Sequence, residues 1–303
     1  MISARGRARY LPPAPDPTGS GTLGQVVRAH RPRVAATYLL TLVENLFWVS
    51  YPWATGVAID GLLAGRWLDL APLLATWSVH ILVAAARRAY DTRLFTRIYG
   101  IVAARTVVRQ RAAGAGTTEV AARAAMAREA VDFFEREVPA AVAVTVGLLG
   151  AVGMLFVYDL LVGLVAVGLL VPVYALNRAY GRRARRLNRG LNDRVEREVA
   201  VVAEGSREAV AAHFAAVARW RVRLSDAEVA NQALIEAAAL GAVVLVLLRT
   251  AGLPGIQTGE IYAILAYMWT VLDQLDEVPV IVQRLARLAD IRRRLEDDGP
   301  AAG

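Results

Sequence analysis

The chain has 303 residues, 56% of them hydrophobic, and a formal net charge of +8. It contains no cysteine, which excludes disulfide bonds, thiolate metal sites and cysteine nucleophiles. Its 35 basic residues are all arginine. So much apolar sequence beside so much charge is unusual for a soluble domain, but it is typical of a membrane protein, where the two are separated in space.

Six apolar segments approach or exceed the ~20 residues that a helix needs to cross ~30 Å of hydrocarbon. The first, third and fifth connections between them are short, whereas the second and fourth are about fifty residues long and rich in arginine. This alternation predicts an all-α membrane protein with three hairpins of transmembrane helices that extend far beyond the membrane on one side. The predicted spans are Val34–Ile59, Leu70–Ala86, Val138–Val157, Leu160–Tyr180, Leu234–Leu248 and Ile256–Leu272.

The distribution of arginine predicts the orientation. Arg66 and Arg249 are the only arginines in the short turns, and the long connections and both ends carry nearly all the others. By the positive-inside rule the long connections and both termini are cytoplasmic. Residues 1–22 lack the apolar core of a signal peptide, so we expect a disordered cytoplasmic arm, a six-helix domain over 23–296 and a flexible tail over 297–303. Because the arginines flank spans and alternate with acidic residues, nucleic-acid binding is not expected.

The two long connections keep a helical pattern that short runs of turn residues interrupt. We expect each connection to fold as a helical hairpin whose tip stands about 30 Å from the membrane, since twenty helical residues rise about 30 Å. Residues 121–137 are expected to continue directly into the third span. The tip residues are Gly114, Gly116 and Thr117 in the first hairpin and Glu204, Gly205 and Arg207 in the second.

Ionisable residues within spans are costly and indicate functional sites. If the first pair of spans turns near residues 65–66, Glu44 lies level with Arg87, and His80 lies level with Tyr51. An ion pair between Glu44 and Arg87, or the adjacent arginine, would neutralise both charges. It would act as a static lock or take part in substrate binding and gating, while His80 is either a packing residue or a protonation site. The candidate network here consists of Glu44, His80, Arg87, Arg88 and Asp91.

A second group of carboxylates lies at the cytoplasmic ends of spans five and six. If this hairpin turns near Pro254, then Glu236 lies at the depth of Asp273, Asp276 and Glu277. Such a group needs counter-charges or raised pKa values. It would receive a cationic solute, carry protons, or pair with arginines of neighbouring helices. The three histidines are on different segments, so no metal site is expected, and no catalytic constellation is present.

This plan of six helices, short outer turns and two long inner hairpins resembles the transmembrane domain of exporter-type ABC transporters. The resemblance covers residues 20–296 and implies a homodimer in the lipid bilayer of the bacterial inner membrane, with the hairpin tips as coupling helices. Three strings are also similar to a bacterial subfamily that lacks a fused ATPase domain: RRAYDTR at Arg87–Arg93, EAVDFFE at Glu129–Glu135 and LNDRVE at Leu191–Glu196.

The phosphate-binding loop of an ATPase needs a lysine, and the 303 residues of this sequence include none. We therefore expect this chain to be a transport subunit without enzyme activity or a cofactor of its own, and ATP to be hydrolysed by a separate subunit at the tips. One alternative is a proton-gradient-driven transporter of a solute or peptide, as in bacterial peptide-uptake proteins with only this domain. Its candidate proton carriers are Glu44, Glu236, Asp273 and Glu277. Another alternative is a non-transporting membrane scaffold.

Overall fold

The computed structural model describes residues 30–275 and 277. In this part of the chain all regular elements are helices, and no strand occurs. The described helices form two compact units, one within Met1–Ala151 and Gln257–Gly303 and the other within Val152–Ile256. The expected arm at 1–22 and tail at 297–303 lie outside the described residues. Among the described helices, four are long and apolar enough to cross a membrane: Trp67–Ala112, Thr117–Tyr158, Leu160–Ala203 and Arg207–Ala251.

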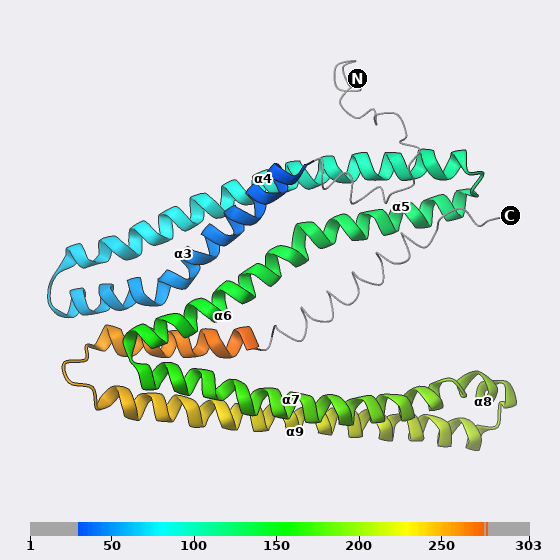
Figure 1. Cartoon of the computed structure of the whole chain (residues 1–303). Coiled ribbons are helices and arrows are strands. Elements are labelled where there is room, and N and C mark those ends of the chain that lie inside the picture. Colours follow the sequence, from blue (N-terminus) through cyan, green and yellow to red (C-terminus); the bar gives the residue numbers. More distant parts are fainter. Residues whose placement is uncertain (1–29, 276, 278–303) are drawn as a thin grey trace, which may run out of the picture. The chain divides into compact units, whose positions relative to one another are not determined.

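The first unit begins with a hairpin of two long helices (Figure 1). Helix α3 covers Arg31–Leu63, the 3₁₀ turn η1 covers Trp67–Leu70, and α4 covers Ala71–Ala112. The reversal uses Gly65, whose φ of 72° favours glycine. The first two predicted spans therefore lie in α3 and α4, and the hairpin turns where the sequence predicts.

Helix α5 (Thr117–Asp132) continues without a break through the π-helical turn η2 (Phe133–Glu137) into α6 (Val138–Tyr158). The predicted continuity into the third span is confirmed, but the π turn was not predicted. Pro139 explains it, because proline has no N–H to donate to the carbonyl four residues earlier. The Val138 N–H bonds to the Phe133 carbonyl instead, which widens the turn.

The apolar core of the first unit lies where α3, α4 and α5 meet. Tyr38, Tyr90, Tyr99, Ile101 and Phe134 surround it as partly buried neighbours. This core fixes α3 and α4 against each other beside the polar cluster described below. Its buried residues are Val34, Leu94, Phe95, Ile98, Val102, Ala127 and Val131.

Glycines bring the last described helical segment, residues 258–275, against α3. A Cβ on Gly56 or on Gly259 would overlap the backbone of the other residue. The N–H of Gly259 donates to Asp60 Oδ1 at 2.7 Å, so a side chain from α3 caps the start of this helix. In α6, a Cβ on Gly150 would lie 2.7 Å from Val49. Close packing through small residues therefore holds these membrane helices together.

The second unit is an antiparallel pair of very long helices (Figure 1). Helix α7 covers Leu160–Val195 and α9 covers Arg207–Ala251, and they lie side by side along their lengths. The short helix α8, Glu198–Glu204, joins them at one end. Inside the pair, Asn231 donates an amide hydrogen bond to Asn177 at 3.0 Å. The break between α7 and α8 was not predicted.

Asp159 holds the opposite end of this unit together. Its carboxylate caps α7 by accepting hydrogen bonds from the N–H groups of Leu161 and Val162, at 3.0 and 3.1 Å. Arg249 of α9 donates to both oxygens of the same carboxylate, at 3.1 and 2.8 Å. One side chain therefore caps one helix and binds the other.

The Arg249 guanidinium holds the pKa of Asp159 below its ordinary value of 3.8. Because the folded-state pKa is the lower one, the carboxylate contributes stability above about pH 4 and loses it as the pH falls through the folded-state pKa. We expect the thermal unfolding midpoint of the wild type to exceed that of Asp159→Asn at pH 7. This difference should become smaller at pH 2.5. Asp226→Asn, which changes an exposed carboxylate of α9, is the control. A difference between wild type and Asp159→Asn that does not change with pH would contradict this prediction.

Candidate functional site

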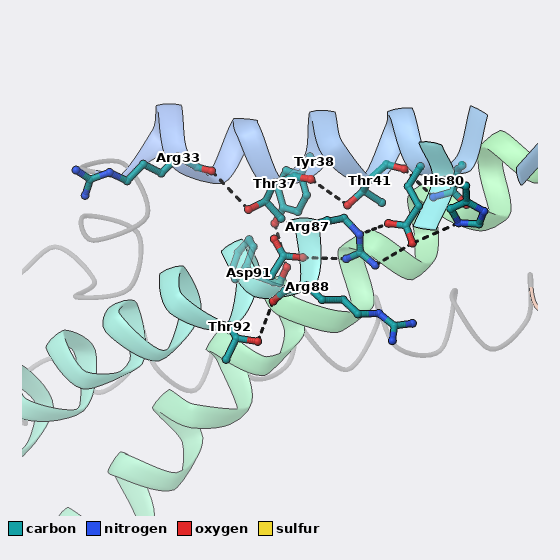
Figure 2. Close-up of polar contacts among 12 residues, drawn as sticks. Arg33, Thr37, Tyr38, Thr41, His80, Arg87, Arg88, Asp91 and Thr92 are labelled. Carbon is teal, nitrogen blue, oxygen red and sulfur yellow. Dashed lines mark hydrogen bonds and ion pairs between the residues drawn. The ribbon is translucent and has the colours of Figure 1, made fainter. Parts of the chain in front are cut away.

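Glu44, Arg87 and Asp91 form a charge cluster between α3 and α4 (Figure 2). Nε of Arg87 donates to Glu44 Oε2, and Nη2 of Arg87 lies 3.4 Å from Glu44 Oε1. Nη1 of Arg87 donates to Asp91 Oδ2 at 2.8 Å, across one turn of α4. The predicted contact of Glu44 with Arg87 is present in the structure, and Asp91 shares the same guanidinium.

The cluster is largely shielded by protein. The exposed fractions of the side chains are 14% for Glu44, 17% for Arg87 and 7% for Asp91. Two carboxylates and one guanidinium leave a net charge of −1 when all three are ionised. Thr37 of α3 is fully buried, and its side chain lies against the Asp91 carboxylate of α4. A single cation is therefore shared by two shielded acids, and one more positive charge would balance the site.

His80 extends the cluster toward the turn of the hairpin. Its Nε2 lies 4.0 Å from Glu44 Oε1, and its Nδ1 is hydrogen-bonded to the Tyr51 hydroxyl. The Tyr51 ring also packs against Trp48 and Trp77, with centroids 5.4 and 5.3 Å apart. The predicted level of His80 beside Tyr51 is found. From Tyr51, a continuous set of polar groups therefore runs through His80, Glu44 and Arg87 to Asp91.

Tyr38 connects α3 to the π turn on the other side of the cluster. Its hydroxyl donates to the carbonyl of Phe134 at 3.2 Å. In a regular α-helix the N–H of Val138 would bond to that carbonyl, but it bonds to Phe133 instead. The next residue, Pro139, has no N–H to offer. The tyrosine therefore supplies a hydrogen bond that the helix itself cannot make.

The other predicted members of the network lie differently. Arg88 is exposed and points away from the cluster, so Arg87 is the arginine that Glu44 binds (Figure 2). Glu236 is exposed on α9 and accepts a hydrogen bond from Gln232 at 3.1 Å. Asp273 and Glu277 are exposed in the first unit. Asp276 lies outside the described residues. A site that combines these carboxylates stays a prediction.

The first predicted hairpin tip is present at the junction of α4 and α5. Gly114, with a φ of 78°, follows the end of α4, and Gly116 precedes α5 in an extended conformation. Thr117 opens α5, and its hydroxyl accepts a hydrogen bond from Arg111 at 3.3 Å. The reversal therefore occurs within the residues that the sequence indicates.

The second tip lies between α8 and α9. Gly205, with a φ of 69°, follows Glu204 at the end of α8. Ser206 caps α9 by accepting a hydrogen bond from the Ala209 N–H, and Arg207 is the first residue of that helix. Gly205 and Arg207 are exposed, so both are available to a partner.

The family model for the ABC transporter transmembrane region matches residues 23–259. The chain belongs to this family. No curated protein matches its sequence. Membership of the ABC transporter transmembrane region establishes a multi-pass membrane protein that serves transport, and it agrees with the all-helical architecture of both units.

As part of an ABC transporter transmembrane region, the charge cluster lies in the first hairpin of helices, and together with the neighbouring Tyr38 it involves two of the three strings. Arg87 and Asp91 come from the string RRAYDTR, and the Phe134 carbonyl comes from EAVDFFE. Thr37 and Tyr38 were missed by the sequence analysis, since a neutral side chain on an apolar helix gives no distinct signal. Within the described residues, no group of three or more His, Asp or Glu side chains is placed to hold a metal ion.

Replacing Tyr38 with Phe should leave the Phe134 carbonyl without a donor while keeping the aromatic ring in the core. A fully buried acceptor that loses its partner costs about 1–3 kcal/mol. This bond is part-buried, so the free energy of unfolding should fall by about 1 kcal/mol, the lower end of that range. Tyr90→Phe is the matched control, because the Tyr90 hydroxyl bonds to the Arg33 carbonyl at an exposed position. Denaturant titration in mild detergent measures both. Equal stability of the two variants would show that the Tyr38 bond has no special role.

Proposed function

We propose that the chain is the translocation subunit of an ABC-type transporter, and that alternating access is driven by ATP hydrolysed on a separate subunit. Two copies would form the membrane part, and the ATPase subunits would bind the hairpin tips. The substrate would be exposed to each side of the membrane in turn.

The observation that carries this proposal is the pair of helical hairpins, in a chain whose family is the ABC transporter transmembrane region. Each hairpin projects helical sequence well beyond an apolar stretch and ends in a sharp break, at 113–116 and 205–206. Helices packed side by side transmit a push at one end to the other with little deformation, because protein interiors are densely packed. A tip moved by an ATPase would therefore move the membrane helices with it.

A proton-gradient-driven transporter with the same fold is the second candidate. The observation that favours it is the buried cluster in which Arg87 serves both Glu44 and Asp91. Its net charge of −1 would be balanced by one proton, and His80 lies 4.0 Å from Glu44. In this alternative the cluster would carry the proton, and the hairpin tips would have no energetic role.

Purification from native membranes separates the two candidates. After crosslinking in the membrane and extraction in mild detergent, mass spectrometry should identify a P-loop ATPase without membrane spans, retained in a fixed ratio to this chain. The same preparation from Gly116→Trp and Arg207→Glu variants should lose the ATPase. A preparation in which no ATPase is retained in any of several mild detergents would contradict the leading proposal.

A further inference from the structure

One face of α7 carries an unbroken stripe of exposed side chains whose character changes from apolar to cationic. The stripe begins with exposed apolar residues: Leu160, Leu164, Val167, Val171 and Tyr174. It continues with exposed arginines: Arg178, Arg182, Arg185 and Arg189. Successive members are three or four residues apart, so at ~100° per residue they fall within roughly 80° of the helix circumference.

This stripe lies away from the contact between α7 and α9. The buried residues of α7 are Val162, Gly163, Ala166, Leu169 and Val173. At ~100° per residue, Val162, Ala166, Leu169 and Val173 fall on the other side of the helix, and Gly163 lies just beyond the edge of the stripe. The arginines of the stripe are therefore not part of the packing inside the second unit, and their charges face outward.

Three arginines of the stripe, Arg178, Arg182 and Arg185, have no acidic residue within reach along their own helix. Residues 160–189 contain neither Asp nor Glu. Elsewhere in the described chain an arginine often binds an acid four residues away, as Arg87 binds Asp91 and Arg123 binds Glu119. In the described part of the chain, Arg178, Arg182 and Arg185 take part in no ion pair. Such a set of uncompensated cations is complementary to an anionic ligand.

The position of the change in character matches the depth of a lipid headgroup. Residues 160–177 rise about 27 Å as a helix, close to the ~30 Å of the hydrocarbon core. Arg178 therefore lies where hydrocarbon meets phosphate, and Arg182 lies about 6 Å farther out. Arg185 is long enough to reach back toward that level. Tyr174 occupies the boundary, where aromatic side chains with a polar tip are enriched.

We propose that this stripe binds an anionic glycerophospholipid in the leaflet on the side of the hairpin tips. The acyl chains lie along Leu164, Val167 and Val171, and the phosphate is held by Arg178, Arg182 and Arg185. Arginine suits this role because its planar donors bind phosphate oxygens in pairs. The bound lipid neutralises charge that the chain itself leaves unpaired.

Lipid is favoured over a second copy of the chain as the occupant of this face. Two such stripes brought together would place arginines against arginines, which is unfavourable, and the stripe contains no acid to relieve the repulsion. The order of apolar residues followed by cations also repeats the order of tail and headgroup in a lipid. A soluble anion would use the arginines only and would make no use of the apolar half.

Native mass spectrometry of the full chain in mild detergent, titrated with phosphatidylglycerol or phosphatidylcholine, tests the proposal. The wild type should bind phosphatidylglycerol more tightly, and inorganic phosphate should not displace it. The variant Arg178→Gln/Arg182→Gln/Arg185→Gln should lose this preference, by roughly fivefold for each arginine neutralised. The control Arg194→Gln/Arg219→Gln/Arg221→Gln removes the same charge from exposed positions farther along the hairpin and should keep the preference.

A photoreactive phosphatidylglycerol added to the wild type should crosslink to peptides within residues 160–189, which tests the site without any substitution. Crosslinks confined to other helices would overturn the proposal. So would equal binding by the stripe variant and the control, or displacement of the lipid by inorganic phosphate. A stripe variant that dissociates into monomers while its lipid binding is unchanged would show instead that a second copy covers this face.

Discussion

Replacing Arg87 with Leu should destabilise the protein by about 3–5 kcal/mol, because it leaves two shielded carboxylates without their counter-charge. Glu44 and Asp91 both bind this guanidinium, and their side chains are only 14% and 7% exposed. Glu44→Gln should cost much less, since Arg87 keeps its bond to Asp91 and the amide can still accept a hydrogen bond. Glu44→Leu should lie between the two.

Combining substitutions should recover stability in a definite order. Glu44→Leu/Arg87→Leu should recover only part of the loss, because Asp91 is still buried and unpaired. Adding Asp91→Asn should recover more, since removing all members of a buried ionic group can be near neutral. Arg88→Leu is the matched control, because it removes an adjacent arginine that is exposed. Unfolding in detergent measures all six variants, and equal stability of Arg87→Leu and Arg88→Leu would show that the cluster contributes nothing.

Changing the hairpin tips should abolish coupling to an ATPase without unfolding the membrane helices. Gly116 has an extended backbone, and a Cβ atom there would meet no atom within 4 Å. Gly116→Trp should therefore fold normally and obstruct a docked partner. Arg207→Glu reverses a charge at the second tip. Each should reduce ATP hydrolysis by the purified complex at least tenfold, as expected when an interface contact worth about 2 kcal/mol is lost.

The control for the second tip is Arg219→Glu, an identical change at an exposed position of the same helix, α9. Its ATP hydrolysis and its thermal unfolding midpoint should match those of the wild type. If Gly116→Trp and Arg207→Glu also hydrolyse ATP at the rate of the wild type, the tips do not bind the ATPase. If one of these two variants unfolds at a lower temperature than the wild type, the variant at the other tip is used to test whether the ATPase binds the tips.

The parts of the fold that depend on local sequence could be predicted. Glycine marks the reversals at Gly65, Gly114 and Gly205, because a positive φ favours that residue. Once the first turn is placed, the helical rise alone brings Glu44 level with Arg87. That contact could be predicted because both partners lie on neighbouring antiparallel helices.

Contacts between distant segments could not be predicted in this way. Gly56 and Gly259 meet across most of the chain, and a glycine on an apolar helix looks alike whether it faces lipid or a neighbour. The bond from Tyr38 to the Phe134 carbonyl depends on a π turn that appears only when Pro139 is placed in the helix. Arg249 was noticed as an isolated arginine in a short turn, but its partner Asp159 was not, because the pairing depends on how α7 and α9 are aligned.

The central claim is that ATP hydrolysed on another subunit moves the hairpin tips. The chain has no cysteine, so Ala113→Cys and Ala203→Cys would place two spin labels at exposed positions beside the tips without further changes. Double electron–electron resonance on the complex purified from native membranes and reconstituted in vesicles then reports the distance between the labels. We predict that ATP with Mg²⁺ shifts this distance and that an imposed pH gradient alone does not. A distance that responds to the pH gradient and is unchanged by ATP would contradict the account.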